Sequence, residues 1–355
     1  MRPHAFFVVV TLCVITITLK TFSVAEDVAV NETDAVPNRQ AQCVVPRFEV
    51  PGIVCPWSDY MGLTNMILNM LECLLLASVA GCGDGQFVAH IPYTVQHGTI
   101  LDLFHSSALT SLEHTLHIRI SLFCRGEIAM IPQWNVTHRQ NVTLLRGKAC
   151  GKKTLRIQSA FELDLFPPHD IVPHFHTLLK MPSELVRNAV KKIQSGLGRP
   201  YIGIHLRLEP DVWALMDYWS MSTTSVHPHL FFNTTFVNFV NKHLNATQKL
   251  WSMYGTYRTS GGVGLLLRDK SDFIDEGSMN ATTSYTIDNR VVTISNSTAA
   301  LVDFIVVWES NVALVARYSS FGTYLRDLRC VRRGRFVGPT FEYGKDLSVR
   351  DPCED

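Results

Sequence analysis

The sequence has little net charge of either sign. Its 355 residues include 32 Lys and Arg and 31 Asp and Glu, which gives a formal net charge of +1. An extended basic surface for nucleic acid or for an anionic membrane is therefore not predicted, and any anion site has to be built locally. The content of 46% hydrophobic residues is typical of one large or two ordinary globular domains.

Common cofactor signatures are also missing. The sequence contains no Cys-x-x-Cys pair, and its histidines are not spaced as ligands beside the cysteines, so we expect no metal site. The glycine-led run at residues 261–267 lacks the G-x-G-x-x-G spacing and a following helix, which argues against a dinucleotide fingerprint. No internal repeat is present, so a solenoid is not predicted.

Only the N-terminal segment has the features of a membrane or targeting segment. Arg2 and His4 precede an apolar run at residues 5–19, and Ser23-Val24-Ala25 has the small-x-small pattern of a signal peptidase site. Residues 1–25 are predicted to be a cleaved signal peptide or a short signal anchor. No later stretch is predicted to span a membrane. We therefore expect the remainder in the lumen of the Golgi or endoplasmic reticulum. If the segment is a signal anchor and is not cleaved, the protein is a type II membrane protein anchored only there.

Two further features favour the secretory pathway. Outside the signal, which holds Cys13, an even eight cysteines remain, and such a count predicts disulfides whose pairing stays open. These cysteines are Cys43, Cys55, Cys73, Cys82, Cys124, Cys150, Cys330 and Cys353. Seven Asn-x-Ser/Thr sequons are candidates for N-glycosylation. They begin at Asn31, Asn135, Asn141, Asn233, Asn245, Asn280 and Asn296.

Helices and strands are predicted to alternate along the chain. Apolar spacing predicts helices at residues 61–80 and 181–193, and the Gly/Pro-rich stop at residues 196–200 precedes a buried strand that starts at Tyr201. This alternation predicts an α/β fold with doubly wound parallel sheets. We divide the chain into a polar stem at residues 26–42, an N-terminal domain at 43–198 and a C-terminal domain at 199–355.

The strand that starts at Tyr201 leads into a cluster of polar residues. His205, Arg207, Glu209 and Asp211 occupy alternate positions, so a continued strand would present them on one side. Open α/β sheets bind ligands at the carboxyl ends of their strands. This edge is therefore the predicted binding site, and a structural ion pair between Arg207 and Asp211 is the alternative.

The second half of the predicted site lies later in the chain. The apolar run 299–307 is predicted to be a strand, and Ser319-Ser320 opens a helix that runs through Arg329. A helix start binds phosphate, and Arg207 could contact the same anion in a bidentate manner. We expect the segment 303–321 to lie beside the Tyr201 strand in one sheet. The basic residues Arg326, Arg329, Arg332, Arg333 and Arg335 are predicted to form a solvated face.

Five segments, in chain order, resemble motifs of the GDP-fucose protein O-fucosyltransferase superfamily, including its large plant branch. Each motif is weak alone, and the ordered set spans roughly residues 60–333. The segments are Gly62-Leu63-Thr64-Asn65-Met66 (family G-L-x-N), Ile100-Leu101-Asp102-Leu103-Phe104 (F-x-D-L-F), residues 203–211 (H-L-R-x-E-x-D), residues 300–312 (A-x-x-D-[YF]-x-V-x-x-E-S-D-V) and Tyr318-Ser319-Ser320-Phe321-Gly322, where the family turns into its final helix.

The resemblance implies a GT-B fold, with two Rossmann-like domains facing across a cleft. It implies an inverting, metal-independent transferase that moves fucose from GDP-fucose to a hydroxyl of a protein or glycan. By motif position, Arg207 is similar to the arginine that contacts the donor diphosphate and is critical for activity. The other matched positions are His205 and Asp211 toward the ribose and base, Asp303, Ser319, Ser320 and Phe321 in the later donor-binding segment, and Gly62 and Asn65 on the side of the sugar and acceptor.

Departures from the family pattern keep other functions open. Ile67 and Leu68 stand where the family has an arginine after its asparagine, Asn311 replaces an Asp, and no acid matches a catalytic base. The alternatives are transfer of another deoxysugar such as rhamnose, an inactive secretory glycoprotein that keeps the fold as a binding module, and an unrelated disulfide-rich surface protein. For single residues, the alternative to a ligand contact is a structural role. This role is core packing for His205 and Asp303, and helix capping for Ser319, Ser320 and Asn65.

Overall fold

The structure is a computed structural model of the chain. It describes residues 50–55, 62–83, 85–95, 98–123, 131–136, 141–158, 165–197, 200–206, 239, 242, 249–254, 282–287, 290–317, 319–331, 338–344 and 348–353. All of these belong to one compact unit, Gln42–Asp355. The predicted signal and stem lie outside the described residues, and the division at residue 198 into two domains stays a prediction.

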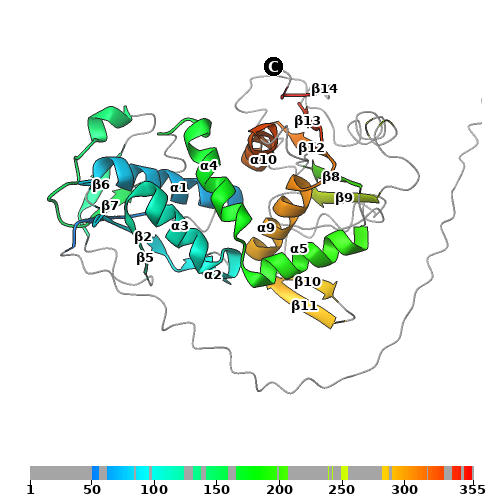
Figure 1. Cartoon of the computed structure of the whole chain (residues 1–355), viewed down its shortest axis with the longest axis horizontal. Coiled ribbons are helices and arrows are strands. Elements are labelled where there is room, and N and C mark those ends of the chain that lie inside the picture. Colours follow the sequence, from blue (N-terminus) through cyan, green and yellow to red (C-terminus); the bar gives the residue numbers. More distant parts are fainter. Residues whose placement is uncertain are drawn as a thin grey trace, which may run out of the picture. The chain divides into compact units, whose positions relative to one another are not determined.

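The first sheet has five strands in the order β5-β2-β1-β7-β6, and every pair in it is parallel (Figure 1). Parallel neighbours need crossover connections, and helices α1 and α3 supply them between β1, β2 and β5. The elements are β1 (Gly52–Val54), α1 (Leu63–Ala80), β2 (Val88–Pro92), the hairpin β3 (Thr94–Val95) and β4 (Gly98–Thr99), α2 (Ile100–Leu103), α3 (Ser106–Leu116), β5 (Arg119–Phe123), β6 (Gln133–Asn135), the 3₁₀ helix η3 (Val142–Leu145) and β7 (Leu155–Gln158).

The second sheet has the order β14-β13-β12-β8-β9 and is parallel except for its edge pair β13–β14. The predicted strand at Tyr201 is confirmed as β8, next to the centre of the sheet. The parallel α/β class is therefore confirmed. The elements are α4 (Pro168–Lys180), α5 (Glu184–Leu197), β8 (Tyr201–Leu206), β9 (Lys249–Tyr254), the hairpin β10 (Thr282–Ile287) and β11 (Arg290–Ser295), α9 (Asn296–Trp308), β12 (Val312–Ala316), α10 (Ser320–Val331), β13 (Thr340–Tyr343) and β14 (Val349–Arg350).

Helix α1 confirms the first predicted helix. Gly62 occupies its N-cap and Gly81 its C-cap, and residues on every side of it are buried. By length and composition alone it is apolar enough to cross a membrane, which the sequence did not predict for any later segment. Most of it is buried among the other elements of the unit, and the core helix of a globular protein passes the same test. The helix therefore serves here as the centre of a core.

The predicted strand at residues 299–307 is wrong, because this run forms most of helix α9. Nearly all of its side chains are buried, from Ala299 to Trp308. A short continuous apolar run does not distinguish a buried strand from a buried helix by periodicity. The strand that lies beside β8 is β12, which follows α9 and was not predicted separately. The prediction that residues 303–321 lie beside the Tyr201 strand in one sheet is thus confirmed only for β12, in the middle of that segment.

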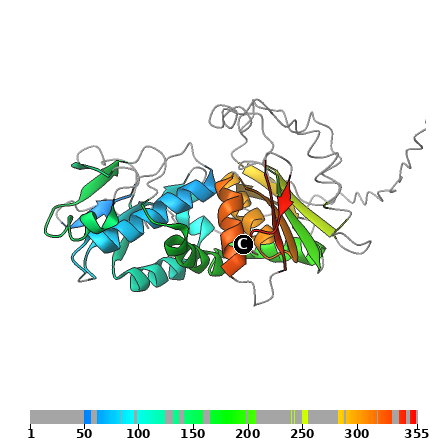
Figure 2. The ribbon, with the colours of Figure 1, turned by 90° about the horizontal axis from the view of Figure 1, so that it is seen from above.

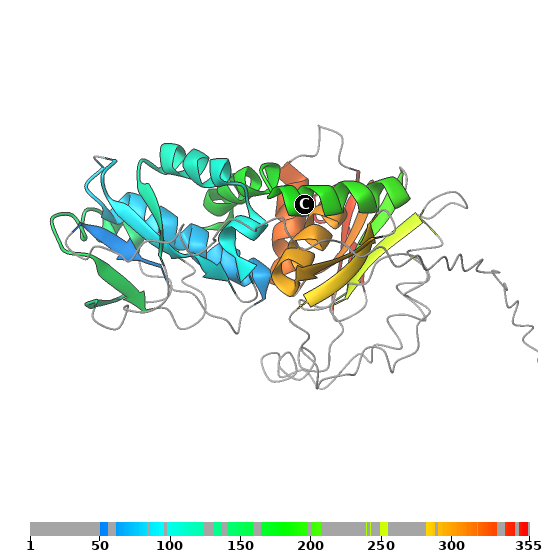
Figure 3. The ribbon, with the colours of Figure 1, turned by 90° about the horizontal axis from the view of Figure 1, so that it is seen from below.

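Helices α9 and α10 lie together on one face of the second sheet (Figure 2). Gly203 of β8 permits this approach, because a Cβ there would lie 2.9 Å from the Val307 Cα. Helix α5 runs alongside α9, as Figure 3 shows from below. The sequence predicted α5 at residues 181–193, and the observed helix begins after Ser183, whose hydroxyl accepts from the Val186 N–H at 3.2 Å.

Helix α4 was not predicted from the sequence. It starts with Pro168 in its first turn, a position that suits proline, but it also contains Pro173, which normally ends a helix. Its apolar side chains Ile171, Phe175 and Leu178 are buried at helical spacing. The Phe175 ring lies 5.2 Å from that of Phe304, so α4 packs against α9 through aromatic contact.

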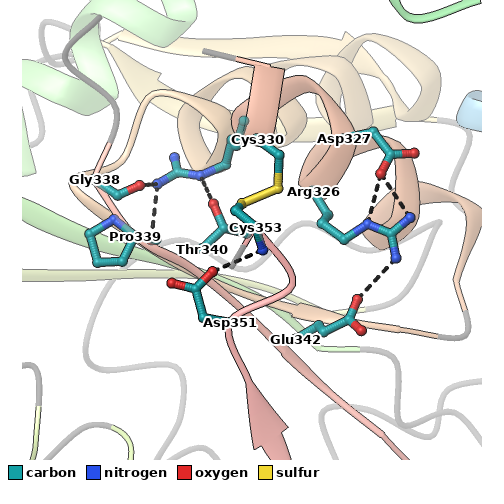
Figure 4. The surroundings of a disulfide bond; sticks show 10 residues. Arg326, Asp327, Cys330, Gly338, Pro339, Thr340, Glu342, Asp351 and Cys353 are labelled. Atoms are coloured by element: carbon teal, nitrogen blue, oxygen red, sulfur yellow. Dashed lines mark hydrogen bonds and ion pairs between the residues drawn. A yellow bond between two sulfur atoms is a disulfide. The ribbon is translucent and has the colours of Figure 1, made fainter. Parts of the chain in front are cut away.

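Three disulfides join cysteines of the described part. They are Cys55–Cys73, Cys82–Cys150 and Cys330–Cys353, and Cys43 and Cys124 lie outside the described residues. The last bond ties the end of α10 to the chain that follows β14 (Figure 4). Disulfides persist in oxidising compartments, so these bonds are consistent with a protein of the secretory lumen.

Arg329 corrects the prediction of a solvated basic face on α10. Its side chain is only 1% exposed, and its guanidinium donates to backbone carbonyls of Trp308 (2.6 Å), Ser310 (2.9 Å) and Gly338 (3.1 Å). Burial lowers its pKa to about 9, which still leaves it charged at neutral pH. This arginine therefore binds the carboxyl end of α9 to the loop before β13. Arg332, Arg333 and Arg335 lie outside the described residues.

Candidate functional site

The carboxyl ends of β8 and β12 form the edge at which a ligand is expected. The two strands are adjacent and parallel, with Ile202 opposite Val312 and Ile204 opposite Leu314. They therefore end at the same edge of the sheet, at Leu206 and Ala316. Ligands of open α/β sheets bind outside this edge.

Helix α10 begins directly after β12 and confirms the predicted helix start. The Thr323 N–H donates to the Ser319 carbonyl at 2.8 Å, which makes Ser319 the residue that precedes the first helical turn. The N–H groups of the first turn, from Ser320 onward, have no acceptor within a helix of this geometry. Together with the helix dipole they favour an anion at this end of α10.

Gly322 sets how closely α10 approaches the strand. A Cβ on this residue would lie 2.1 Å from the Ala316 carbonyl oxygen, a separation that no side chain tolerates. Only glycine therefore allows the first turn of α10 to rest against the end of β12. This contact fixes the helix start relative to the edge formed by β8 and β12.

His205 is packed beneath the start of α10. Its ring stacks on that of Phe321 with centroids 4.4 Å apart, and the residue is fully buried. The Tyr343 hydroxyl donates to the His205 carbonyl oxygen at 3.2 Å, which holds the end of β8 from the other side of β12. The structure brings His205 and Phe321 together, as the sequence predicted. The burial of the ring favours packing, and its contact with a donor stays a prediction.

Asp303 lies on helix α9 and not at the start of a strand, which corrects the sequence prediction. It is fully buried, one residue before Phe304. The ring of Phe304 lies 4.6 Å from that of Phe321 in an edge-to-face arrangement. Asp303 therefore belongs to the layer that supports the first turn of α10, and a direct role in donor binding is untested.

Arg317 is a cationic residue that the sequence analysis missed. It follows β12 directly, two residues before Ser319, and its side chain is 57% exposed. Its guanidinium lies 3.8 Å from the buried Glu342, which is also paired with Arg326 at 3.1 Å and with Arg350. The sequence signal that could have identified Arg317 is a basic residue between the apolar run 299–307 and the pair Ser319-Ser320.

Three described arginines lie within ion-pair distance of Glu342, at positions 317, 326 and 350. Arg326 is also paired with Asp327, and Figure 4 shows it between the two carboxylates. Burial opposes the charge of Arg326, but its bonds to Asp327 and Glu342 outweigh this effect and raise its pKa. Arg317 is the most exposed and most distant member, so it is the arginine that can turn toward an anion at the start of α10.

Gly62 and Asn65 lie at the start of α1. Gly62 is the N-cap, and no side chain caps the helix, so the alternative that Asn65 caps α1 is wrong. Asn65 is the third helical residue, and its side-chain oxygen is buried with no hydrogen-bond partner among the described residues. A buried acceptor without a donor is unfavourable, so this amide is suited to a ligand hydroxyl.

A cavity of about 680 Å³ lies between α4 and the second half of α10. Its walls include Val172, His176, Arg326, Leu328 and Val331. These residues of α10 belong to its carboxyl half, whereas the predicted site uses its first turn. The cavity is therefore distinct from the edge formed by β8 and β12.

Comparison with solved structures identifies the fold. POFUT1 in complex with GDP-fucose matches with a TM-score of 0.52 and 11% sequence identity, over 84% of this chain and 98% of that chain. The chain shares the fold of POFUT1. A second crystal form of that complex matches at 12% identity over 83% and 98% of the two chains, but with a TM-score of 0.48 it adds no further argument. No protein-family profile and no curated protein sequence matches the chain.

The likeness to POFUT1 confirms the predicted resemblance to fucosyltransferases at the level of the fold. It also supports a GT-B-like α/β class. The predicted donor residues Arg207 and Asp211, with Glu209, lie outside the described residues, although Arg207 follows the last residue of β8 in sequence. Within the described ranges, no group of three His, Cys, Asp or Glu side chains could hold a metal ion. The predicted independence from metal is not tested by this finding.

Proposed function

We propose that this protein is an inverting, metal-independent glycosyltransferase that moves fucose from GDP-fucose to a hydroxyl of a protein or glycan in the secretory lumen. The observation that carries this proposal is the first turn of α10, held against the end of β12 by Gly322 and beside the end of β8. It supplies an anion site at the edge where open α/β sheets bind ligands, and the POFUT1 structure with this fold is a complex with GDP-fucose.

The donor diphosphate is proposed to lie at the start of α10. Backbone N–H groups from Ser320 onward face it, and Arg207 provides a guanidinium from the residue after β8. Arg317 adds a second cation from the end of β12. Ser319, Phe321 and Asp303 hold this turn in place, and His205 and Asp211 complete the side toward the ribose and base.

The reaction needs stabilisation of negative charge on the leaving group. The acceptor hydroxyl attacks the anomeric carbon, the new C–O bond forms on the face opposite the diphosphate, and the C–O bond to the β-phosphate breaks. Both bonding electrons leave with GDP, and the hydroxyl proton passes to water, to the departing phosphate or to a base. Fixed positive charge at Arg207 and the helix start stabilises GDP as it leaves, without a metal.

The sugar is proposed to face α1. Asn65 offers the buried amide oxygen that has no partner within the described part of the chain, and Gly62 leaves the start of this helix without a side-chain cap. A fucose hydroxyl that donates to this amide satisfies an acceptor that is otherwise left without a bond.

The test is release of GDP from GDP-fucose by the secreted full chain, with and without candidate glycoprotein acceptors. Arg207→Ala should lower the rate by about 100-fold or more, because a lost donor to a leaving group has costs of this order. Arg146→Ala, at an exposed arginine beside η3, is the control and should match the wild type. A folded Arg207→Ala protein with the wild-type rate contradicts the proposal.

A binding module without activity is the second candidate. It is favoured by Ile67 and Leu68, which stand where the related family has an arginine and are 1% and 5% exposed. These apolar side chains offer neither the charge nor the hydrogen-bond donors of an arginine to a substrate. Binding of GDP without release of GDP from GDP-fucose supports this candidate, whereas release from another GDP-deoxysugar, such as GDP-rhamnose, supports transfer of a different sugar.

A further inference from the structure

The sequons at Asn135 and Asn141 both have an exposed asparagine. Asn135 is the last residue of β6, and its side chain is exposed. Strand β6 is the edge of this sheet and pairs only with β7 among the described strands. Asn141 is also exposed and precedes the 3₁₀ helix η3.

The chain around Asn141 is held in a defined conformation. The Asn141 side-chain oxygen accepts from the Thr143 N–H at 2.9 Å, which forms a turn across the sequon and leaves Thr143 exposed. The segment that follows is bound to α1, since the Gly147 N–H donates to the Val79 carbonyl and Cys150 is bonded to Cys82. Both members of this sequon therefore stay at the surface in the folded protein.

Each of the two asparagines lies close to a feature that favours association between molecules. An edge strand presents unpaired backbone groups that can pair with another chain. Leu144 in η3 is 62% exposed, and it is one of the few large apolar side chains at the surface of the described part. It lies three residues after Asn141, so both features lie within reach of a sugar chain on these asparagines.

We propose that Asn135 and Asn141 carry N-linked oligosaccharides, and that these cover the edge of β6 and the side chain of Leu144. The third described sequon, at Asn296, is left out because its Thr298 is 1% exposed at the start of α9. Asn135 belongs to the first sheet and Asn141 to the segment bound to the end of α1, whereas the proposed diphosphate site belongs to the second sheet. Removal of the glycans should therefore leave GDP binding unchanged.

The modification is a lumenal group transfer. The asparagine amide nitrogen attacks C1 of an oligosaccharide carried on a polyprenyl diphosphate. The N–C1 bond forms, the C1–O bond to phosphate breaks, an amide proton is lost and the polyprenyl diphosphate leaves. This chemistry requires passage through the lumen, which the disulfides also favour.

Occupancy is tested on the full chain secreted by eukaryotic cells. Treatment with peptide-N-glycosidase in ¹⁸O water should leave ¹⁸O-labelled aspartate at positions 135 and 141 in peptide mass spectra. Thr143→Ala should abolish the label at 141 and Thr143→Ser should keep it, because the sequon accepts either hydroxyl. Unmodified asparagine at both positions in the wild type overturns the proposal.

Shielding is tested separately. Removing the glycans from the folded protein should raise the fraction of multimers in size-exclusion chromatography, with an unchanged melting temperature. The double variant Asn135→Gln/Asn141→Gln should behave in the same way, and adding Leu144→Ser should reduce the multimers. If the deglycosylated protein elutes as one species of unchanged association state, the shielding role is wrong even where both sites are occupied.

Discussion

Replacing Gly322 by alanine tests whether the start of α10 is held where the structure has it. Gly322 lies in the first turn of a helix, where intrinsic propensity alone favours alanine over glycine by about 1 kcal/mol. The close contact with Ala316 opposes this preference. The sign of the change in stability therefore decides between the two effects.

The contact between position 322 and Ala316 determines how large the loss of stability should be. The new Cβ would lie 2.1 Å from the Ala316 carbonyl oxygen and 3.0 Å from its carbonyl carbon. Both atoms belong to the backbone of a central strand, so α10 has to move away by roughly 1 Å to restore ordinary contact. Overpacking of this kind costs about 1–3 kcal/mol, and because neither backbone atom can turn aside we take the upper part of this range, about 2–3 kcal/mol, against a gain of about 1 kcal/mol from propensity. We expect Gly322→Ala to lose about 1–2 kcal/mol.

The assay is denaturant unfolding with the disulfides intact, read as the free energy of unfolding at an unchanged m value. Gly147→Ala is the control, because its Cβ meets no atom of the described residues within 4 Å and only its positive φ of 67° is strained, at about 1–2 kcal/mol. Only Gly322→Ala should also weaken GDP binding, by about tenfold or more, since it displaces the anion site. A Gly322→Ala protein as stable as the wild type refutes the reasoning.

Three further predictions concern buried and charged groups. Arg329→Met should lower the free energy of unfolding by about 3–5 kcal/mol, because buried carbonyls of Trp308, Ser310 and Gly338 lose their donor. Arg350→Met is the control, and because this arginine is half-exposed its loss should cost at most about 1 kcal/mol. A loss below about 1 kcal/mol for Arg329→Met in urea unfolding would contradict this role. His90 is buried and has no hydrogen-bond partner in the part of the chain that the structure describes, and burial lowers its pKa from 6.5 to about 4. Between these pH values the unfolded chain binds a proton at His90 that the folded chain does not bind. The free energy of unfolding should therefore fall by up to about 3 kcal/mol as pH drops from 6.5 to 4. His90→Met should remove this contribution when unfolding is measured at several pH values. Arg317→Gln should weaken GDP binding by about tenfold at low salt with little change in melting temperature, because its side chain is exposed; equal GDP affinity in calorimetry would exclude a contact.

Helix starts and one central strand could be predicted from the sequence because their signals are local. Gly62 before an apolar run, Ser319-Ser320 before a mixed segment and Tyr201 after a Gly/Pro stop each mark a boundary that the structure has within a few residues. Helix α4 escaped prediction because Pro173 interrupts a pattern that tertiary packing of Phe175 nevertheless stabilises.

The error at α9 and the missed role of Arg329 have a different origin. A run buried on all sides loses the periodicity that separates a helix from a strand, and the partners of a buried arginine are distant in sequence. Arg329 satisfies carbonyls of α9 and of Gly338, groups that no local pattern brings together. The pairing of the cysteines was likewise decided by packing and not by spacing.

A crystal structure of the protein with GDP tests the central claim most directly. We predict that the diphosphate lies at the first turn of α10, with the guanidinium of Arg207 within hydrogen-bond distance of its oxygens. Soaking with UDP under the same conditions should leave this site without a nucleotide. GDP bound elsewhere, or a site at α10 that stays empty at GDP concentrations well above micromolar, would contradict the account.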